Sequence, residues 1–421
     1  MGLAPESSAP APPDLTDLAF WARPEPERLA AFARLRALDR PVFFPEPRVP
    51  LLRPGGGFHA LVRHADVLEA SRNSAVFSSE PAAVSPEPPP WLPLVFGRPL
   101  VNMDDPRHAR LRRIVSRAFA PRRLDALDGE IADTVDEIVA RLARHGTGDF
   151  VADAARELPI HVICSMLGIP RERRDHVLSR IDVMTEYSGV RGEMHRLATA
   201  RLLVGNLRAI VDLRRFVVGL GRARRRDPGD DILSALVTAD VDGERLSLRE
   251  LGSFFDLLLV AGNETVRNAA SHGLVLLTEH PDQRDRLAAD PDALMGTAIE
   301  EIVRLCSPIV QFRRTLTRDH ELRGHLLPAG SKVVLFYGSA NRDEAVFDAP
   351  DTFDVGRRPN PHVGFGGPGA HLCLGAHLAR RELGALFRAV LDRLPGLRAD
   401  GPAVPLRSAF DNGIVALPYR T

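Results

Sequence analysis

The residues with the clearest capacity for chemistry surround Cys373, in the stretch from Phe365 to Gly375. Three glycines and a proline separate Phe365 from a cysteine that opens a predicted helix. Backbone N–H groups and the N-terminal end of a helix stabilise a thiolate at such a position. Because glycines also let a flat ligand approach the backbone, the stretch favours a thiolate ligand for a bulky planar cofactor. A nucleophilic Cys373 with His371 as its base is the alternative.

The other two cysteines, Cys164 and Cys306, lie in apolar helical patterns without comparable surroundings. We interpret them as buried structural cysteines. An odd and sparse set of three cysteines argues against a disulfide framework. It fits a reducing compartment, so we expect a cytoplasmic protein.

A second chemically suggestive cluster, Ala261-Gly-Asn-Glu-Thr265, lies in the middle of a long helical pattern. Glycine inside a helix costs about 1 kcal/mol relative to alanine, and Asn and Thr are weak helix formers. The cluster therefore indicates a local bulge where a ligand lies close to the backbone. Equally open is a Thr265 hydroxyl bonded to the carbonyl four residues earlier, with Glu264 on a solvated flank.

The helix that carries this cluster has clear boundaries. Ser247 and Glu250 form a predicted capping box, and Pro281 ends the pattern after His280. At 1.5 Å for each residue, the helix would be roughly 48 Å long, enough to cross a small domain.

Helical periodicity covers most of residues 106–307, and one more amphipathic helix spans about 374–394. Residues 310–338 indicate strands instead. Because these pieces interleave along the chain, we predict a mainly α fold, with a large helical body and a small β-rich portion. We expect a single domain over residues 18–421, preceded by a flexible N-terminal tail over residues 1–17.

Composition excludes some classes of partner. The chain has 55 basic and 55 acidic residues, which removes the general electrostatic argument for binding nucleic acid or an anionic membrane. No apolar run reaches the length of about 18 residues that a membrane-spanning helix needs, so we expect no membrane anchor.

Five segments, in the same order along the chain, resemble motifs of the cytochrome P450 family. They are His108-Ala-Arg-Leu-Arg112, Ala261-Gly-Asn-Glu-Thr265, Glu301-Ile-Val-Arg304, Phe353-Asp-Val-Gly-Arg357 with Pro359-Asn-Pro-His362, and the stretch from Phe365 to Gly375. The resemblance covers the chain from about residue 20 to its end. It implies the cytochrome P450 fold and an oxidoreductase that contains haem b.

The resemblance also implies roles for individual residues around the haem. Cys373 would be the axial thiolate ligand of the iron. Basic residues match the positions that hold the haem propionates: His108, Arg112, Arg314 and His371. Arg313 is less suited than its neighbour Arg314. Further matched positions contact the haem: Ala261, Gly262, Phe365 and Gly375. Three others resemble a structural ion network behind it: Glu301, Arg304 and Arg357.

On the opposite face of the haem, the resemblance implies that Thr265 hydrogen-bonds dioxygen and that Glu264 supplies protons. This pair favours a monooxygenase that hydroxylates a C–H bond of a hydrophobic small molecule, using O2 and two electrons. The alternatives are a peroxygenase or oxidative-coupling enzyme of natural-product biosynthesis, and a non-catalytic P450-like recruitment module. The presence of Cys373, Glu264 and Thr265 argues against the module.

Substrate class is indicated by the loop between Phe365 and Cys373, which has seven residues where the commonest family loop has six. The longer loop resembles an actinobacterial subgroup that oxidises steroids, terpenoids and lipids, and natural-product tailoring competes with it. A proline-rich loop over residues 81–99 is expected to cover an apolar pocket. By family position, the candidate lining residues are Met184, Tyr187, Val260, Ile309, Val310, Phe312 and Phe410.

Electrons are expected to come from a ferredoxin and a ferredoxin reductase, because no segment remains for a flavin or iron–sulfur domain. Four arginines could form a local positive patch for an acidic ferredoxin: Arg113, Arg117, Arg122 and Arg123. We expect a monomer.

Overall fold

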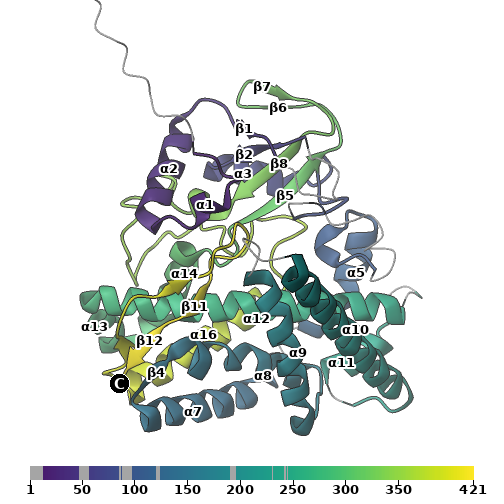
Figure 1. The fold of residues 1–421 in the computed structure, drawn as a ribbon, viewed down its shortest axis with the longest axis vertical. Helices are drawn as coiled ribbons and strands as arrows, with labels where there is room; N and C mark the ends of the chain where they lie inside the picture. Colours follow the sequence, from purple (N-terminus) through teal and green to yellow (C-terminus); the bar gives the residue numbers. More distant parts are fainter. Residues whose placement is uncertain are drawn as a thin grey trace, which may run out of the picture.

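The protein is described by a computed structural model over residues 13–46, 56–84, 87, 97–119, 124–189, 196–229, 231–240, 243 and 245–421. The side chains of residues 18, 118, 182, 184–189 and 196–203 are not described. A strand-rich part lies above a larger helical part in Figure 1.

The strand-rich part is built on one five-stranded sheet. Its order is β1 (Val42–Phe44), β2 (Phe58–Leu61), β8 (Lys332–Phe336), β5 (Gln311–Leu316) and β3 (Phe77–Ser78). β2 and β8 run parallel, and every other neighbouring pair is antiparallel. The sheet is accompanied by α1 (Leu18–Trp21), α2 (Glu25–Ala37), α3 (His64–Arg72), α15 (Tyr337–Ala340) and the hairpin of β6 (His320–Leu322) and β7 (His325–Leu327).

The helical part holds most of the remaining chain. Its helices are α5 (Arg107–Ser116), α7 (Asp128–His145), α8 (Glu157–Met166), α9 (Arg171–Gly189), α10 (Arg196–Arg226), α11 (Ile232–Thr238), α12 (Leu248–Glu279), α13 (Pro281–Ala289), α14 (Pro291–Cys306) and α16 (Ala376–Arg393). Short helical turns occur at η1 (Leu100–Asn102), η2 (Arg117–Phe119) and η3 (Val151–Ala155). Two small sheets join β4 (Thr147–Asp149), β12 (Pro418–Arg420) and β9 (Arg398–Ala399), and β10 (Val404–Pro405) with β11 (Ile414–Ala416).

α12 is the central element of the helical part (Figure 1). Ser247 caps it, and the predicted capping box with Glu250 is present in both directions. The helix ends at Glu279, directly before the cap residue His280 and Pro281. The predicted bounds are therefore confirmed, because local capping chemistry determines both ends.

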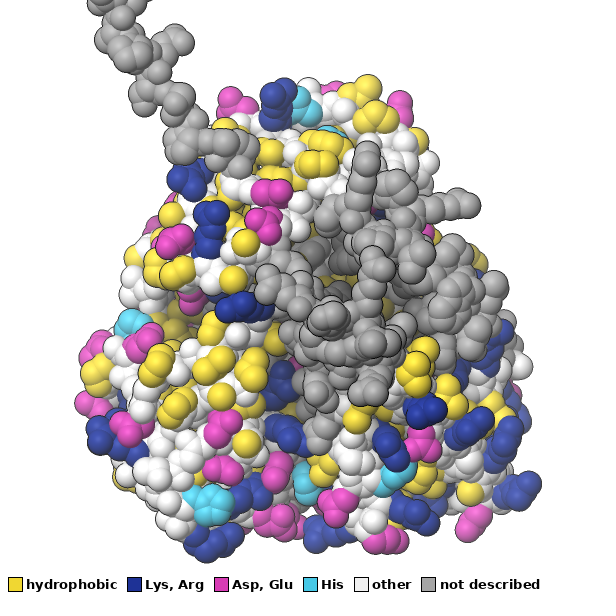
Figure 2. Space-filling view, viewed as in Figure 1, with side chains coloured by type: hydrophobic (Ala, Val, Ile, Leu, Met, Phe, Trp, Pro, Cys, Tyr) yellow, Lys and Arg dark blue, Asp and Glu magenta, His cyan; other side chains and the backbone are white. Residues whose placement is uncertain are grey.

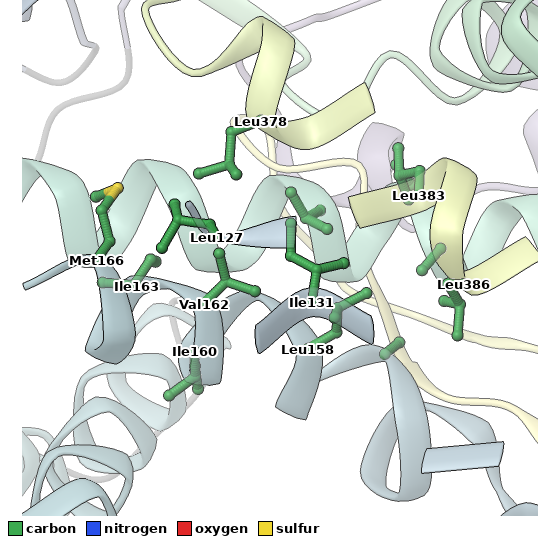
Figure 3. Close-up of a cluster of buried hydrophobic side chains, with 14 of the residues drawn as sticks. Leu127, Ile131, Leu158, Ile160, Val162, Ile163, Met166, Leu378, Leu383 and Leu386 are labelled. Atoms are coloured by element: carbon green, nitrogen blue, oxygen red, sulfur yellow. The ribbon is translucent and has the colours of Figure 1, made fainter. Parts of the chain in front are cut away.

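The largest apolar core surrounds α12. Figure 3 shows side chains from α8 and α16 on two sides of that helix, and both helices pack against it. Buried members of this cluster include Leu158, Ile163, Met166, Leu378, Leu383 and Leu386. Because α8 and α16 flank the same segment of α12, a ligand between α12 and the start of α16 would be held by rigid elements.

The mainly α fold with a small β-rich portion is confirmed, and its pieces interleave as expected, since residues 42–78 and 311–336 share one sheet. Of the expected tail, residues 1–12 lie outside the described residues. Packing begins before residue 18, because Leu15 is only 3% exposed and its carbonyl accepts the Trp21 Nε1–H at 3.0 Å.

Charged side chains of both signs are interspersed over the helical half of the face in Figure 2, in keeping with a formal net charge of zero. Among the described residues, no helix combines the length and the apolar character needed to cross a bilayer.

Candidate active site

Cys373 lies at the end of a loop that the backbone closes on itself. The Cys373 N–H donates to the Phe365 carbonyl at 3.0 Å, and the Gly366 N–H donates to the Val363 carbonyl at 2.9 Å. α16 begins at Ala376 with Gly375 as its N-cap residue, so Cys373 lies just before the helix rather than in its first turn.

Two glycines of this loop are required by the neighbouring helix α3. A Cβ on Gly369 would lie 2.1 Å from the Ser71 carbonyl oxygen, and a Cβ on Gly367 would lie 2.4 Å from the Ser71 hydroxyl. We had expected the glycines to admit a flat ligand. At Gly367 and Gly369 that expectation is wrong, because the loop backbone packs against α3 there.

The Cys373 side chain is accessible to solvent and yet surrounded by protein, which places its sulfur on the floor of a recess. Burial raises the pKa of the thiol. Backbone N–H groups of Gly375 and Ala376 and the guanidinium groups of Arg112 and Arg380 act in the opposite direction. These groups favour an anionic sulfur once a metal cation shares the recess.

Four basic side chains gather beside the loop: His108, Arg112, Arg314 and His371. The ring centroids of His108 and His371 are 4.3 Å apart. Arg112 Nη2 donates to the Leu372 carbonyl at 2.6 Å. Burial and the positive charge of Arg314, the two largest causes, lower the pKa of His371 to about 3.

Within the described residues, neither Arg112 nor Arg314 forms an ion pair with a carboxylate. Arg314 is 4% exposed and donates from Nη1 to the Arg313 carbonyl at 2.7 Å. His108 Nε2 is buried without a hydrogen-bond partner. A bound carboxylate would satisfy such donors, so the cluster fits the propionates of haem b, and Cys373 fits its axial ligand.

The structure brings Glu301, Arg304 and Arg357 into one buried network. Arg304 donates to both carboxylate oxygens of Glu301, at 2.7 and 2.8 Å, and both side chains are 0% exposed. Arg357 Nε donates to the same carboxylate at 2.9 Å, and Asn360 Nδ2 does so at 3.1 Å. The network ties α14 to the segment that precedes the cysteine loop.

α12 is a continuous α-helix through residues 261–265, so the bulge is not observed. Thr265 Oγ1 instead donates to the Ala261 carbonyl at 2.7 Å, the alternative that the sequence left open. Glu264 is not on a solvated flank, because it forms an ion pair with Arg267 and is largely buried.

Gly262 has a packing role that the sequence did not indicate. A Cβ there would lie 2.9 Å from Ile163 Cδ1, so the missing side chain lets α12 and α8 approach closely. Two residues before it, Val260 is 47% exposed although it lies halfway along a mostly buried helix. Ala261 is exposed as well, which identifies this flank of α12 as the wall of an accessible space.

The predicted substrate residues divide into three groups. Phe312 and Phe410 form an edge-to-face pair with ring centroids 5.5 Å apart, and Ile309 forms a bridge to Asp411 beside them. Val310 is buried in the core with Trp21 and Phe336, which favours a structural role over the predicted lining role. The side chains of Met184 and Tyr187 are not described, and most of the loop over residues 81–99 lies outside the described residues.

Sequence reasoning missed a cluster around Phe365. Arg380 lies with its Cζ atom 4.4 Å from the Phe365 ring centroid and forms two hydrogen bonds to Glu300. His362 forms a third hydrogen bond to Glu300, at 2.9 Å. These residues come from three separate segments, so no local spacing in the sequence could have joined them.

Two of the arginines proposed for the positive patch are described. Arg117 Nη1 donates to the Asp240 carbonyl at 3.3 Å, and Arg113 also has an interaction. Arg122 and Arg123 lie outside the described residues.

Comparison with known proteins assigns the class. The family model "Cytochrome P450" matches residues 73–395, so the chain belongs to the cytochrome P450 family, whose enzymes are haem-thiolate monooxygenases. A methyl-branched lipid omega-hydroxylase of Mycobacterium tuberculosis is 43% identical over 408 residues, covering 96% of this chain and 94% of that protein. A steroid C26-monooxygenase of the same species is 39% identical over 427 residues, covering 97% and 93%.

A solved structure agrees with these relatives. A Mycobacterium marinum cytochrome P450 in complex with pseudoionone superposes with a TM-score of 0.89. It is 40% identical, and the match covers 97% of this chain and 98% of that one.

Proposed function

We propose that Cys373 is the axial ligand of haem b in this monooxygenase and that the four basic residues beside its loop hold the propionates. The observation that carries this proposal is the position of Cys373, whose sulfur receives two backbone N–H groups beside Arg112 and Arg314, which have no carboxylate partner among the described residues. When bound, haem supplies the activation of dioxygen that no side chain can perform.

Reduction in the presence of carbon monoxide tests the axial ligand. The purified protein should show the red-shifted Soret band of a thiolate-ligated haem, and Cys373→Ser should lose that band. Cys164→Ser is the matched control, because burial raises the pKa of Cys164 to about 12 and keeps it a neutral thiol. A wild-type protein without the band would contradict the assignment.

Thr265 and Glu264 are proposed to move protons on the other side of the haem. Thr265 Oγ1 can donate its proton towards the reacting oxygen only after it rotates away from the Ala261 carbonyl. Glu264 can then take a proton from solvent and pass it to that hydroxyl, once its contact with Arg267 loosens. A positioned pair of this kind favours O2-dependent hydroxylation over use of peroxide.

The proposed substrate is a lipid, steroid or terpenoid whose hydrophobic chain reaches the haem. Similarity to a methyl-branched lipid hydroxylase and a steroid monooxygenase supports this class. Apolar Val260, Phe312 and Phe410 provide a suitable surface. Titration with branched fatty acids, steroids and terpenoids, followed by the change in haem spin state, would distinguish them. A response only to polar natural-product intermediates would contradict the proposal.

A ferredoxin, reduced by its own reductase, is the proposed electron donor, in a cytoplasm that keeps the three free cysteines reduced. Attraction of an acidic ferredoxin to arginines should make the ferredoxin-driven rate fall as ionic strength rises. A rate that does not respond to salt would argue against arginine-guided docking.

A further inference from the structure

The side chains around Phe365 form a charge cluster that we call the Phe365 clamp, made of Glu300, His362 and Arg380. Glu300 lies on α14 and accepts from Arg380 Nε at 2.5 Å and from Arg380 Nη2 at 2.9 Å. His362 Nε2 lies 2.9 Å from the same carboxylate. A two-pronged contact of this kind fixes the guanidinium in orientation as well as in distance.

The clamp acts directly on the residue that closes the cysteine loop. The Arg380 guanidinium lies 4.4 Å from the Phe365 ring centroid, within the range of a cation–π contact. The His362 ring lies 5.9 Å from the same ring. The Phe365 carbonyl accepts the Cys373 N–H, so the clamp holds the residue that is hydrogen-bonded to the backbone of the cysteine.

The two charges of the clamp oppose each other in their effect on the cysteine. Arg380 carries a positive charge against Phe365, whose carbonyl accepts the Cys373 N–H, so it favours an anionic sulfur on Cys373. Burial raises the pKa of Glu300, but hydrogen bonds from Arg380 and His362 outweigh burial and lower it to about 2. Glu300 is therefore ionised at neutral pH and cancels part of the positive field that Arg380 exerts.

We propose that the Arg380–Glu300 pair sets the reduction potential of the haem through the net charge that it presents to the Cys373 sulfur. A positive charge beside the thiolate draws electron density from the iron and stabilises the reduced, more negative centre, which raises the potential. A negative charge has the opposite effect. Arg380 and Glu300 are thus positioning residues, and the proposal rests on Cys373 being the axial ligand.

The two charges should be removed separately and the midpoint potential measured by spectroelectrochemical titration. Glu300→Gln leaves Arg380 uncompensated, so the potential should rise. Arg380→Gln leaves the Glu300 charge alone, so the potential should fall. The double variant should return close to the wild-type value. A purely structural clamp would not give shifts of opposite sign.

The chain offers a matched control on the same two helices. Arg388 on α16 pairs with Asp292 on α14 at 2.6 Å; Arg388 follows Arg380 on α16, and Asp292 precedes Glu300 in the first turn of α14. Arg388→Gln and Asp292→Asn should leave the potential unchanged. Arg380→Lys keeps the charge without the two-pronged contact, so it should hold the potential closer to wild type than Arg380→Gln does.

The outcomes separate this inference from the proposed function. Absence of the thiolate Soret band in the wild-type protein would reject the ligand assignment itself. A normal band with potentials that shift in the same direction, or do not shift, would overturn the role of the pair. If Arg380→Gln fails to bind haem, the midpoint potentials of Glu300→Gln and Arg380→Lys still test the role of the pair.

Discussion

Thr265 has its hydroxyl proton committed to the Ala261 carbonyl. The hydroxyl therefore stabilises the helix when the reaction is not in progress and becomes a proton donor only after rotation. Thr278, at the C-terminal end of α12, makes the same type of hydrogen bond, to the Leu274 carbonyl at 2.7 Å. Variants of Thr265 and Thr278 therefore distinguish a role in proton transfer from a role in stabilising the helix.

Thr265→Ala should uncouple electron use from hydroxylation. NAD(P)H consumption should continue, product should fall severalfold, and hydrogen peroxide should rise, because protons reach the wrong oxygen or arrive too slowly. Thr278→Ala should keep the wild-type ratio of product to NAD(P)H. Unchanged coupling in Thr265→Ala would remove Thr265 from the proposed proton path.

At this scale the sequence was informative wherever chemistry is local. The residue types around Cys373 and in the Thr265 cluster predict the two faces of the proposed site. The cluster of basic residues proposed to bind the propionates was predicted only through family resemblance. The ion pair of Glu264 with Arg267 was not foreseen, because an i,i+3 pair is equally compatible with two solvated side chains.

Among the elements, α14 and the loop before α16 control the position of the cysteine. Glu301 joins Arg304 of its own helix to Arg357 and Asn360 of the following segment. The Asp354 N–H also donates to this carboxylate, which has no exposed surface, so every member of the network needs the others.

Glu301→Gln should cost several kcal/mol of unfolding free energy, because Arg304 keeps its charge in a fully buried position. Urea unfolding of the purified variant would measure the loss, and haem retention should fall with it. Asp292→Asn, which alters an exposed pair between α14 and α16, should leave the unfolding midpoint unchanged. Equal midpoints for both variants would show that the network is not stabilising.

Gly369→Ala should displace the cysteine loop from α3, because its Cβ would lie 2.1 Å from the Ser71 carbonyl. Haem content and the unfolding midpoint should both fall. Gly296→Ala is the control, since nothing lies within 4 Å of its Cβ on α14, and it should stabilise the helix by about 0.5–1 kcal/mol. Normal haem content in Gly369→Ala would mean that the loop can move without consequence.

Element boundaries were predictable where capping and proline determine them, as for α12. The bulge in α12 was not, because weak helix formers can be overridden by packing and by a side-chain hydrogen bond such as that of Thr265. Gly367 and Gly369 show the same limit. Their sequence pattern signals close approach, but only the fold reveals that Ser71 is the partner.

For the molecule as a whole, the protonation of Glu382, a buried acid, makes stability depend on pH. It lies on α16, is 2% exposed, and has one carboxylate oxygen without a partner. Burial raises its pKa from 4.5 to about 8. Between these values the folded protein holds a proton that the unfolded chain has released, so this group lowers stability as pH rises.

Glu382→Gln should therefore gain stability relative to the wild type as pH increases from about 5 to 8, by up to about 1.4 kcal/mol for each pH unit. At pH 4 the two proteins should differ least. Urea unfolding at several pH values would measure the slope. Glu137 is exposed, so the stability of Glu137→Gln should follow that of the wild type at every pH. If the stability of Glu382→Gln also changes with pH as the wild type does, Glu382 does not hold a proton in the folded protein.

The sheet that joins residues 42–78 to residues 311–336 has a consequence for biosynthesis. His59 of β2 pairs with Val333 of β8, so one edge of β2 has no partner until the ribosome has made β8. At about 5–20 residues per second, that interval lasts roughly 15–55 s. An exposed strand edge of this kind invites aggregation. Because the cysteine loop is translated later still, the nascent chain must survive this interval before it can acquire its cofactor.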